Sequence, residues 1–230
     1  MKIPLLKTVQ ARVRNIPGVT LFLAAVFVVS LLLRLVGQPN YPDCLHRDEV
    51  QFGYNAYSLL ETGRDEWGEL LPLHFKFNGE YHVPSVFYLI ALAMAFVGPT
   101  DTAIRLPAIV LGALIPILGF FFAKELTGNK KIGYFIAVLL AINPWQIINA
   151  RGSGEISIIS QFFGLLGFYF LFLYLKRHSF RQLFIACLSF IVAYFSYIAS
   201  RLDIPLLLGA FLLIFYRKMP SQRLRFQFSP

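Results

Sequence analysis

Long apolar runs alternate with short polar segments along most of the chain. A helix needs about 20 consecutive apolar residues to cross the hydrocarbon core of a bilayer, and several runs approach that length. The pattern therefore predicts an all-α integral membrane protein with about six transmembrane helices. The runs expected to span the membrane are residues 19–36, 104–123, 132–149, 156–175, 182–199 and 202–216.

The first run could be mistaken for the apolar part of a cleaved signal peptide. It is longer than such a segment, which has roughly 7–15 apolar residues. In addition, Arg34 to Gly37 at its end offer no cleavage site made of small residues. We expect an uncleaved signal anchor with residues 1–18 on the cytoplasmic side.

A shorter apolar segment, residues 83–97, decides the topology. Pro84 and the pair Gly98-Pro99 bound it, which leaves roughly 14 residues, a length more typical of an interfacial or re-entrant segment than of a span. Residues 48–60 carry apolar residues in an irregular amphipathic pattern and predict a second helix on the membrane surface. Neither helix is expected to cross the bilayer.

The distribution of charge supports this topology. If residues 83–97 stay outside the membrane, the cytoplasmic segments hold most of the Lys and Arg and only Glu125 among the 12 acids, as the positive-inside rule requires. Both termini are then cytoplasmic, and the large loop 37–103 lies outside. The cytoplasmic segments are residues 1–18, 124–131, 176–181 and 217–230, the last a basic tail.

Composition agrees with a membrane protein. Hydrophobic residues make up 57% of the chain and charged residues 14%, against about 25% charged residues in soluble domains. The net charge of +9 would suggest nucleic acid in a soluble protein. Here the basic residues serve as topology signals, and no basic patch with base-stacking aromatics accompanies them. We expect no nucleic-acid partner.

An adjacent pair of carboxylates, Asp48-Glu49, follows the first span. Such a pair is often only surface, and an acid at a helix N-terminus is stabilised by the helix dipole without any further role. A partly desolvated carboxylate at the membrane boundary is also a suitable general base for an incoming hydroxyl. Both readings remain open on the residues alone.

Two arginines in outer loops are candidates for binding phosphate. Arg151 follows Asn143-Pro144-Trp145, where a proline is expected to break or kink the third span. Arg201 lies between Tyr197 and Pro205. A guanidinium binds phosphate oxygens in bidentate fashion, but an interfacial arginine can equally reach lipid head groups.

Three histidines, His46, His74 and His82, fall in the same outer loop as most of the acids. They could hold a divalent metal with those acids. However, no compact ligand motif such as HExxH is present, so the sequence does not decide for or against a metal.

Several motifs follow one another in a recognisable order. The acidic pair opens the stretch Arg47 to Ala56, and an aromatic stretch with a proline runs from Tyr81 to Tyr88. Further motifs are Val97-Gly98, Arg105 to Gly112, Asn143-Pro144-Trp145 with Ala150-Arg151, and Tyr197 with Arg201-Leu202 and Pro205. In this order they resemble the N-terminal part of membrane glycosyltransferases of the C fold, above all the family-39 type, which includes protein O-mannosyltransferases and aminoarabinose-transferase-like enzymes.

The resemblance implies a transmembrane glycosyltransferase domain over residues 19–216, in the cytoplasmic membrane and with its site facing outside. It implies a sugar donor on a polyprenyl phosphate and a protein, lipid or glycan acceptor. Asp48 is then the expected base and Glu49 its supporting neighbour. Substrate or phosphate binding is expected at Arg151, Glu155, Arg201, His82 and Tyr197.

A base placed opposite the leaving phosphate would invert the anomeric carbon, by analogy with direct displacement in glycosidases. The chain is shorter than typical members of this family, so an inactive fragment is one alternative. A transporter or a non-catalytic membrane subunit is another. Transporters carry their ionisable groups near the bilayer midplane, whereas the expected spans here are nearly free of charge, and this favours the enzyme.

Overall fold

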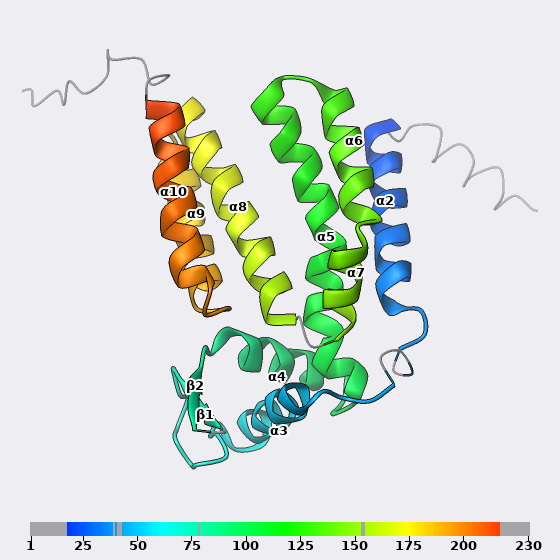
Figure 1. The fold of residues 1–230 in the computed structure, drawn as a ribbon, viewed down its shortest axis with the longest axis vertical. Helices are drawn as coiled ribbons and strands as arrows, with labels where there is room; N and C mark the ends of the chain where they lie inside the picture. The colour runs from blue at the N-terminus through cyan, green and yellow to red at the C-terminus, as the bar shows by residue number, and fades with distance from the viewer. Residues whose placement is uncertain (1–17, 39, 41–42, 78, 153–154, 217–230) are drawn as a thin grey trace, which may run out of the picture.

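The computed structural model describes residues 18–38, 40, 43–77, 79–152 and 155–216. Within them the chain is almost entirely helical, with one short β-hairpin (Figure 1). The elements are α2 (Gly18–Leu35), α3 (Arg47–Thr62), β1 (Phe75–Phe77), β2 (Glu80–His82), α4 (Ser85–Val97), α5 (Asp101–Thr127), α6 (Lys130–Ala141), α7 (Pro144–Arg151), α8 (Glu155–Arg177), α9 (Phe180–Tyr194) and α10 (Ser200–Tyr216).

Helices occupy all six positions at which spans are expected, but they differ in length. Three are long and apolar enough to cross a membrane, namely α2, α5 and the Ser157–Arg177 part of α8. The bent pair α6 and α7 raises the number to four if it is one span. Helices α9 and α10 have 15 and 17 residues, so for these two the crossing stays a prediction.

The third predicted span is broken rather than continuous. Helix α6 ends at Ala141 and α7 begins at Pro144, with a bend of 47° between them. Proline lacks the N–H that a continuing helix would need. Asn143 caps the new helix, because its side chain accepts a hydrogen bond from the backbone N–H of Gln146. The predicted break is confirmed.

The fifth predicted span, 182–199, is too long at its end. The helix stops at Tyr194, and residues 195–199 form turns. The Ser196 hydroxyl donates to the carbonyl of Val192 at 2.6 Å. This bond satisfies a carbonyl of the last helical turn, which lacks a partner within the helix.

Helix α5 lies at the centre of the bundle. It packs against α2, α6, α7 and α8, while α9 packs on α8 and α10 packs on α9 (Figure 1). The contact between α5 and α6 is close. A Cβ at Gly133 would lie 2.9 Å from the backbone oxygen of Phe120, so a larger residue there would push the helices apart, as expected where small residues line helix contacts in membranes.

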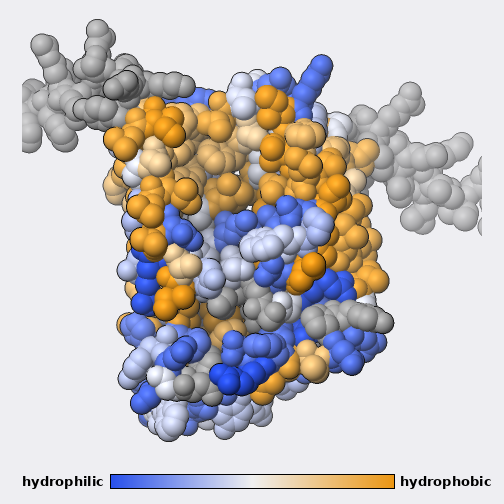
Figure 2. Space-filling view, in the orientation of Figure 1, coloured by the Kyte–Doolittle hydropathy of each residue, from blue (hydrophilic) through white to orange (hydrophobic). Residues whose placement is uncertain are grey.

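Helices α3 and α4 lie across one end of the bundle, with the hairpin beside them (Figure 1). Helices are thus found at both positions where surface helices are expected, over 48–60 and within 83–97, and their place at the membrane surface stays a prediction. Apolar side chains cover much of the bundle, whereas polar ones gather over the end that carries α3 and the hairpin (Figure 2). The chain thus has a polar end, defined here as α3, α4, the hairpin and their connections.

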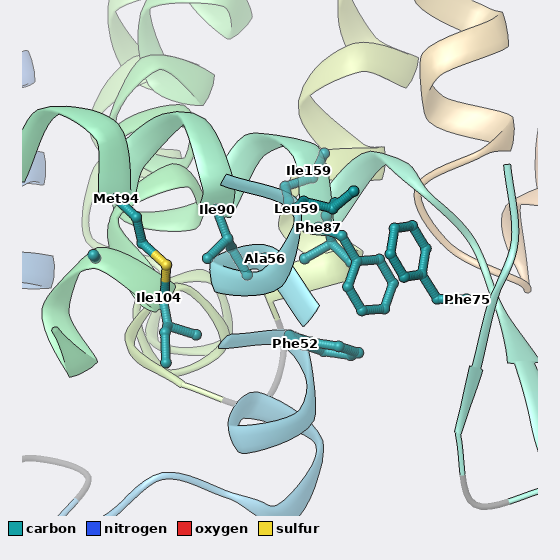
Figure 3. Close-up of a cluster of buried hydrophobic side chains, with 11 residues drawn as sticks. Phe52, Ala56, Leu59, Phe75, Phe87, Ile90, Met94, Ile104 and Ile159 are labelled. Carbon is teal, nitrogen blue, oxygen red and sulfur yellow. The ribbon is translucent and has the colours of Figure 1, made fainter. Parts of the chain in front are cut away.

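An aromatic core holds the polar end together (Figure 3). Phe75 from β1 stacks on Phe87 from α4, with ring centroids 3.8 Å apart, and Phe52 from α3 meets Phe87 edge-on at 5.3 Å. All three rings are buried. Such pairs contribute stability beyond their buried area, so α3, α4 and the hairpin form one packed unit.

Candidate active site

The carboxylates of Asp48 and Glu49 lie in the first turn of α3 and differ in their surroundings. His46 caps the helix: its Nδ1 accepts from the backbone N–H of Asp48 at 3.4 Å, and its own N–H donates to Glu49 Oε2 at 2.7 Å. This reciprocal capping box satisfies N–H groups at the helix start. The two side chains leave the helix in different directions from this point.

Glu49 is buried and paired. Its Oε1 accepts from Arg105 Nε at 2.7 Å and its Oε2 from Arg105 Nη2 at 3.0 Å, and both side chains are only 1% exposed. The two parallel bonds form the bidentate geometry in which arginine and carboxylate bind most strongly. Arg105 belongs to α5, so this pair joins the start of α3 to the central helix of the bundle.

Further bonds complete the surroundings of the Arg105 guanidinium. Nη1 donates to Gln38 Oε1 at 3.0 Å, and Nη2 donates to the carbonyl of Cys44 at 2.9 Å. With donors on both of its oxygens, Glu49 is suited to hold position rather than to accept a proton from a substrate. Buried ion pairs of this kind need such additional bonds to offset the cost of leaving water.

Asp48 remains accessible. Its side chain is 44% exposed, and its neighbours are Arg47, with Nε 3.9 Å from Oδ1, and His46, with Nδ1 3.8 Å from Oδ2. His82, at the end of β2, lies near enough for the charge of Asp48 to act on it. Burial lowers the pKa of His82 below its ordinary value, while Asp48 and Glu80 act in the opposite direction. Asp48 and His82 therefore face a shared polar region.

The other predicted site residues are distributed over two sides of the bundle. Arg151 ends α7, and its Nη1 donates to the carbonyls of Leu33 and Val36 at 3.1 and 2.8 Å. It thus contacts the end of α2 near the Arg105 network. Glu155 opens α8, and its side chain lies outside the described residues.

Arg201 and Tyr197 lie beyond α8, where α10 packs on α9 and α8. Arg201 is exposed in the first turn of α10, with its guanidinium carbon 5.9 Å from the ring centroid of Tyr194. Tyr197 is half-buried in the turn between α9 and α10. Among the described residues, neither side chain forms a hydrogen bond with Asp48.

The histidines do not form a metal centre in the described structure. Among the residues that it describes, no three His, Cys, Asp or Glu side chains gather closely enough to hold a metal ion. His46, His74 and His82 therefore do not supply a ligand set that fits a divalent metal.

Two polar residues essential to this geometry, Arg105 and Gln38, were not predicted as site residues. A signal for Arg105 was present, since it is a charged residue at the start of an apolar run, where ionisable groups are costly and usually have a partner. Gln38 is an uncharged residue in a loop, and its sequence context gave no such signal.

The apolar helices and the polar end define an all-α integral membrane protein. Residues 81–226, more than half of the chain, match the family model of dolichyl-phosphate-mannose-protein mannosyltransferases. The chain belongs to this family of membrane glycosyltransferases, and the resemblance inferred from the sequence motifs is confirmed. The match includes Arg105, Arg151 and Arg201 but begins after Asp48 and Glu49. No protein with curated function and no solved structure matches the chain.

Proposed function

We propose that the chain moves a sugar from a polyprenyl-phosphate donor to a hydroxyl or amine acceptor at the outer face of the cytoplasmic membrane. The observation that supports the proposal is that two neighbouring acids have different surroundings. Glu49 is fixed by Arg105, whereas Asp48 is half-exposed at the polar end of the bundle. Family membership supplies the reaction class.

In this proposal Asp48 is the general base. It removes the proton from the acceptor as the acceptor atom bonds to the anomeric carbon, and the bond from that carbon to the phosphate oxygen breaks. The electron pair leaves with the lipid phosphate. Attack opposite the leaving group inverts the anomeric carbon. Glu49 supports Asp48 by fixing the turn that carries it.

Cations near the leaving phosphate would stabilise its developing charge, because pre-positioned charges need no reorganisation during the reaction. Arg151 and Arg201 remain the proposed phosphate-binding residues, with Glu155, His82 and Tyr197 as further substrate contacts. The exposure of Arg201 supports a role toward a bound ligand. Arg151, with Nη1 on the end of α2, would act from a fixed position.

The decisive experiment is transfer measured in membranes that contain the full chain, with a panel of polyprenyl-phosphate sugars. Asp48→Asn keeps the size of the side chain and removes the base. We expect the transfer rate to fall at least about 100-fold, with an unchanged apparent melting temperature. Asp43→Asn, an exposed acid in the same loop, is the matched control and should retain wild-type transfer. Wild-type transfer by Asp48→Asn would show that the proposed base is wrong.

A topology map tests the location of the site. Reporter fusions or cysteine labelling within residues 65–80 should place this segment outside the cytoplasm, on the same side as Asp48. Finding it in the cytoplasm would contradict both the proposed orientation and transfer at the outer face.

A further inference from the structure

Gln38 lies three residues after the end of α2, and its side-chain amide forms hydrogen bonds with both α5 and α7. Its Nε2 donates to the carbonyl of Arg151 at the end of α7, at 2.8 Å. Its Oε1 accepts from Arg105 Nη1 on α5, at 3.0 Å. Gln38 is half-buried, so both bonds are partly shielded from water. One side chain thereby connects the ends of α2 and α7 with the start of α5.

Arg151 in turn donates hydrogen bonds to the end of α2. Arg151 Nη1 donates to the carbonyls of Leu33 and Val36, which lie at the end of α2. Carbonyls at a helix C-terminus lack partners within the helix, so an arginine there satisfies them. The ends of α2 and α7 therefore hold each other through reciprocal bonds, and the position of one depends on the other.

The bond to Arg105 continues toward Asp48. Arg105 holds Glu49 through two bonds, and Glu49 in turn accepts from the backbone N–H of His46, which caps α3. The result is one continuous path of hydrogen bonds from the end of α7 through Gln38 to the first turn of α3. Asp48 is part of that turn.

Apolar packing does not fix this turn in the same way. The buried apolar residues of α3 begin at Phe52, one turn after Asp48, and continue through Ala56 and Leu59 (Figure 3). Leu45, before this turn, packs against the same apolar cluster, whereas Cys44 and Glu49 contact α5 through polar bonds to Arg105. The position of Asp48 relative to the bundle therefore depends on the bonds around Arg105, to which Gln38 contributes.

We propose that Gln38 is a positioning residue, which couples the break between α6 and α7 to the placement of Asp48. An amide is suited to this task because it donates and accepts at once, whereas a carboxylate only accepts and a thioether does neither in practice. The proposal rests on Asp48 being the base of the transferase. A displacement of about 1 Å at a reacting group can lower a rate by about 100-fold, so a residue that touches no substrate can control kcat.

The first test needs no activity. Amide hydrogen exchange is measured by mass spectrometry on the full chain in detergent micelles, for the wild type and for Gln38→Met and Gln38→Glu. In Gln38→Met, which loses both bonds, we expect exchange to rise about fivefold or more in residues 44–52 and in 144–151. In Gln38→Glu, which keeps the acceptor for Arg105 but loses the donor to Arg151, the rise should be large in 144–151 and smaller, but still present, in 44–52.

Gln182→Met is the matched control, because Gln182 lies on α9, far along the chain from this network. It should change exchange in neither segment. Unchanged exchange of residues 44–52 in Gln38→Met would overturn the coupling, whatever the activity. If Gln38→Met does not fold, Gln38→Glu still decides, since a rise in 144–151 with no rise in 44–52 would overturn the coupling.

The second test uses transfer kinetics. Gln38→Met should lower kcat about tenfold or more, and the KM for the donor should change less than kcat, because the bond lost at Arg151 is to its backbone carbonyl and not to the proposed phosphate-binding guanidinium. In Gln38→Glu, kcat should fall less than in Gln38→Met. A merely structural role would lower the amount of folded protein and leave the kcat of the folded fraction as it was, and that result would overturn the proposal. Absence of transfer by the wild type with every donor would count against the proposed function instead, while the exchange result would stand.

Discussion

Two sides of the bundle are stabilised by different interactions. On one side, α2, α5, α7 and the start of α3 meet through arginines, a carboxylate and backbone carbonyls. On the other side, α8, α9 and α10 meet through aromatic rings and serines. The buried charged side chains in the described part of the chain are Arg34, Glu49, Asp65 and Arg105, all of which precede α6.

The side formed by α8, α9 and α10 shows how apolar packing works without charge. Phe168 contacts Phe190 at 5.0 Å and Phe211 at 5.4 Å between ring centroids, which joins the three helices. Its buried polar side chains include the serines Ser160, Ser189 and Ser200. Ser160 contacts the Ser200 hydroxyl and donates to the carbonyl of Ala193, and Ser189 donates to a carbonyl of its own helix.

This difference separates holding a helix in the bundle from orienting a chemical group. Ring contacts and van der Waals packing are nearly non-directional and tolerate small shifts. Charge-assisted hydrogen bonds fix both distance and direction. The directional contacts are found beside Asp48, the proposed base, and the apolar contacts hold α8, α9 and α10 together.

The largest expected effect comes from the buried ion pair. Glu49→Gln would leave the Arg105 guanidinium buried with a neutral amide in place of a carboxylate. Breaking one half of a buried pair costs about 3–5 kcal/mol, so the apparent melting temperature of the chain in detergent should fall sharply. Combining Glu49→Gln with Arg105→Met should recover a large part of that loss, because neither member of this pair then remains as a buried charge.

An ion pair at the other end of the bundle provides the control for this prediction. Lys176 Nζ lies 3.2 Å from Glu125 Oε2, and the side chains are 47% and 23% exposed. Lys176→Met should cost at most about 1 kcal/mol, as expected for pairs open to solvent. If Glu49→Gln costs no more than Lys176→Met, the assignment of Glu49 to a position-fixing role is wrong.

The apolar side is tested by two glycines of α8. A Cβ at Gly167 would lie 2.6 Å from Cε1 of Phe190, whereas a Cβ at Gly164 would meet no atom within 4 Å. Gly167→Ala should therefore destabilise the chain by about 1–3 kcal/mol through overpacking. Gly164→Ala should be neutral or stabilising by up to about 1 kcal/mol, because alanine favours the helix over glycine.

Thermal unfolding of both variants in the same detergent gives the comparison. Equal melting temperatures for Gly164→Ala and Gly167→Ala would show that Phe190 moves aside at no cost, and that packing between α8 and α9 is loose. Only the hydrogen bonds and ion pair among α2, α3, α5 and α7 would then distinguish the two sides of the bundle.

The sequence predicted the parts of this fold that depend on local chemistry. Apolar runs located the helices, Asn143-Pro144 located the break before α7, and the short length of 83–97 indicated a surface helix. The hairpin was not predicted, since each of its strands has three residues, too few to show the period of two that identifies a strand.

The site was only half predictable for a different reason. The sequence presents Asp48 and Glu49 as equivalent neighbours, and their separate roles arise because Arg105, 56 residues further along the chain, binds one and not the other. Such a pairing depends on how α3 lies against α5, which no local pattern specifies. Gln38 escaped notice for the same reason, since its importance lies in its two distant partners.

The smallest effect is expected at His82, in the hairpin of the polar end. Burial lowers the pKa of His82 below its ordinary value of 6.5, and the attraction of the proton by Asp48 and Glu80 does not restore it. As the pH falls below 6.5, the unfolded chain therefore takes up a proton that the folded chain does not yet bind. That uptake favours unfolding, so this contribution to stability is present above the ordinary pKa and is lost as the pH falls toward the lowered one.

His82→Gln removes this contribution. Between about pH 8 and about pH 5, the apparent melting temperature of the wild type should fall more than that of His82→Gln, while the exposed His74→Gln should follow the wild type. Parallel curves for the wild type and His82→Gln would show that the His82 side chain is hydrated in solution and that burial does not lower its pKa. A steeper fall in the wild type would indicate that burial lowers the pKa of His82, although the charge of Asp48, the proposed base, acts in the opposite direction.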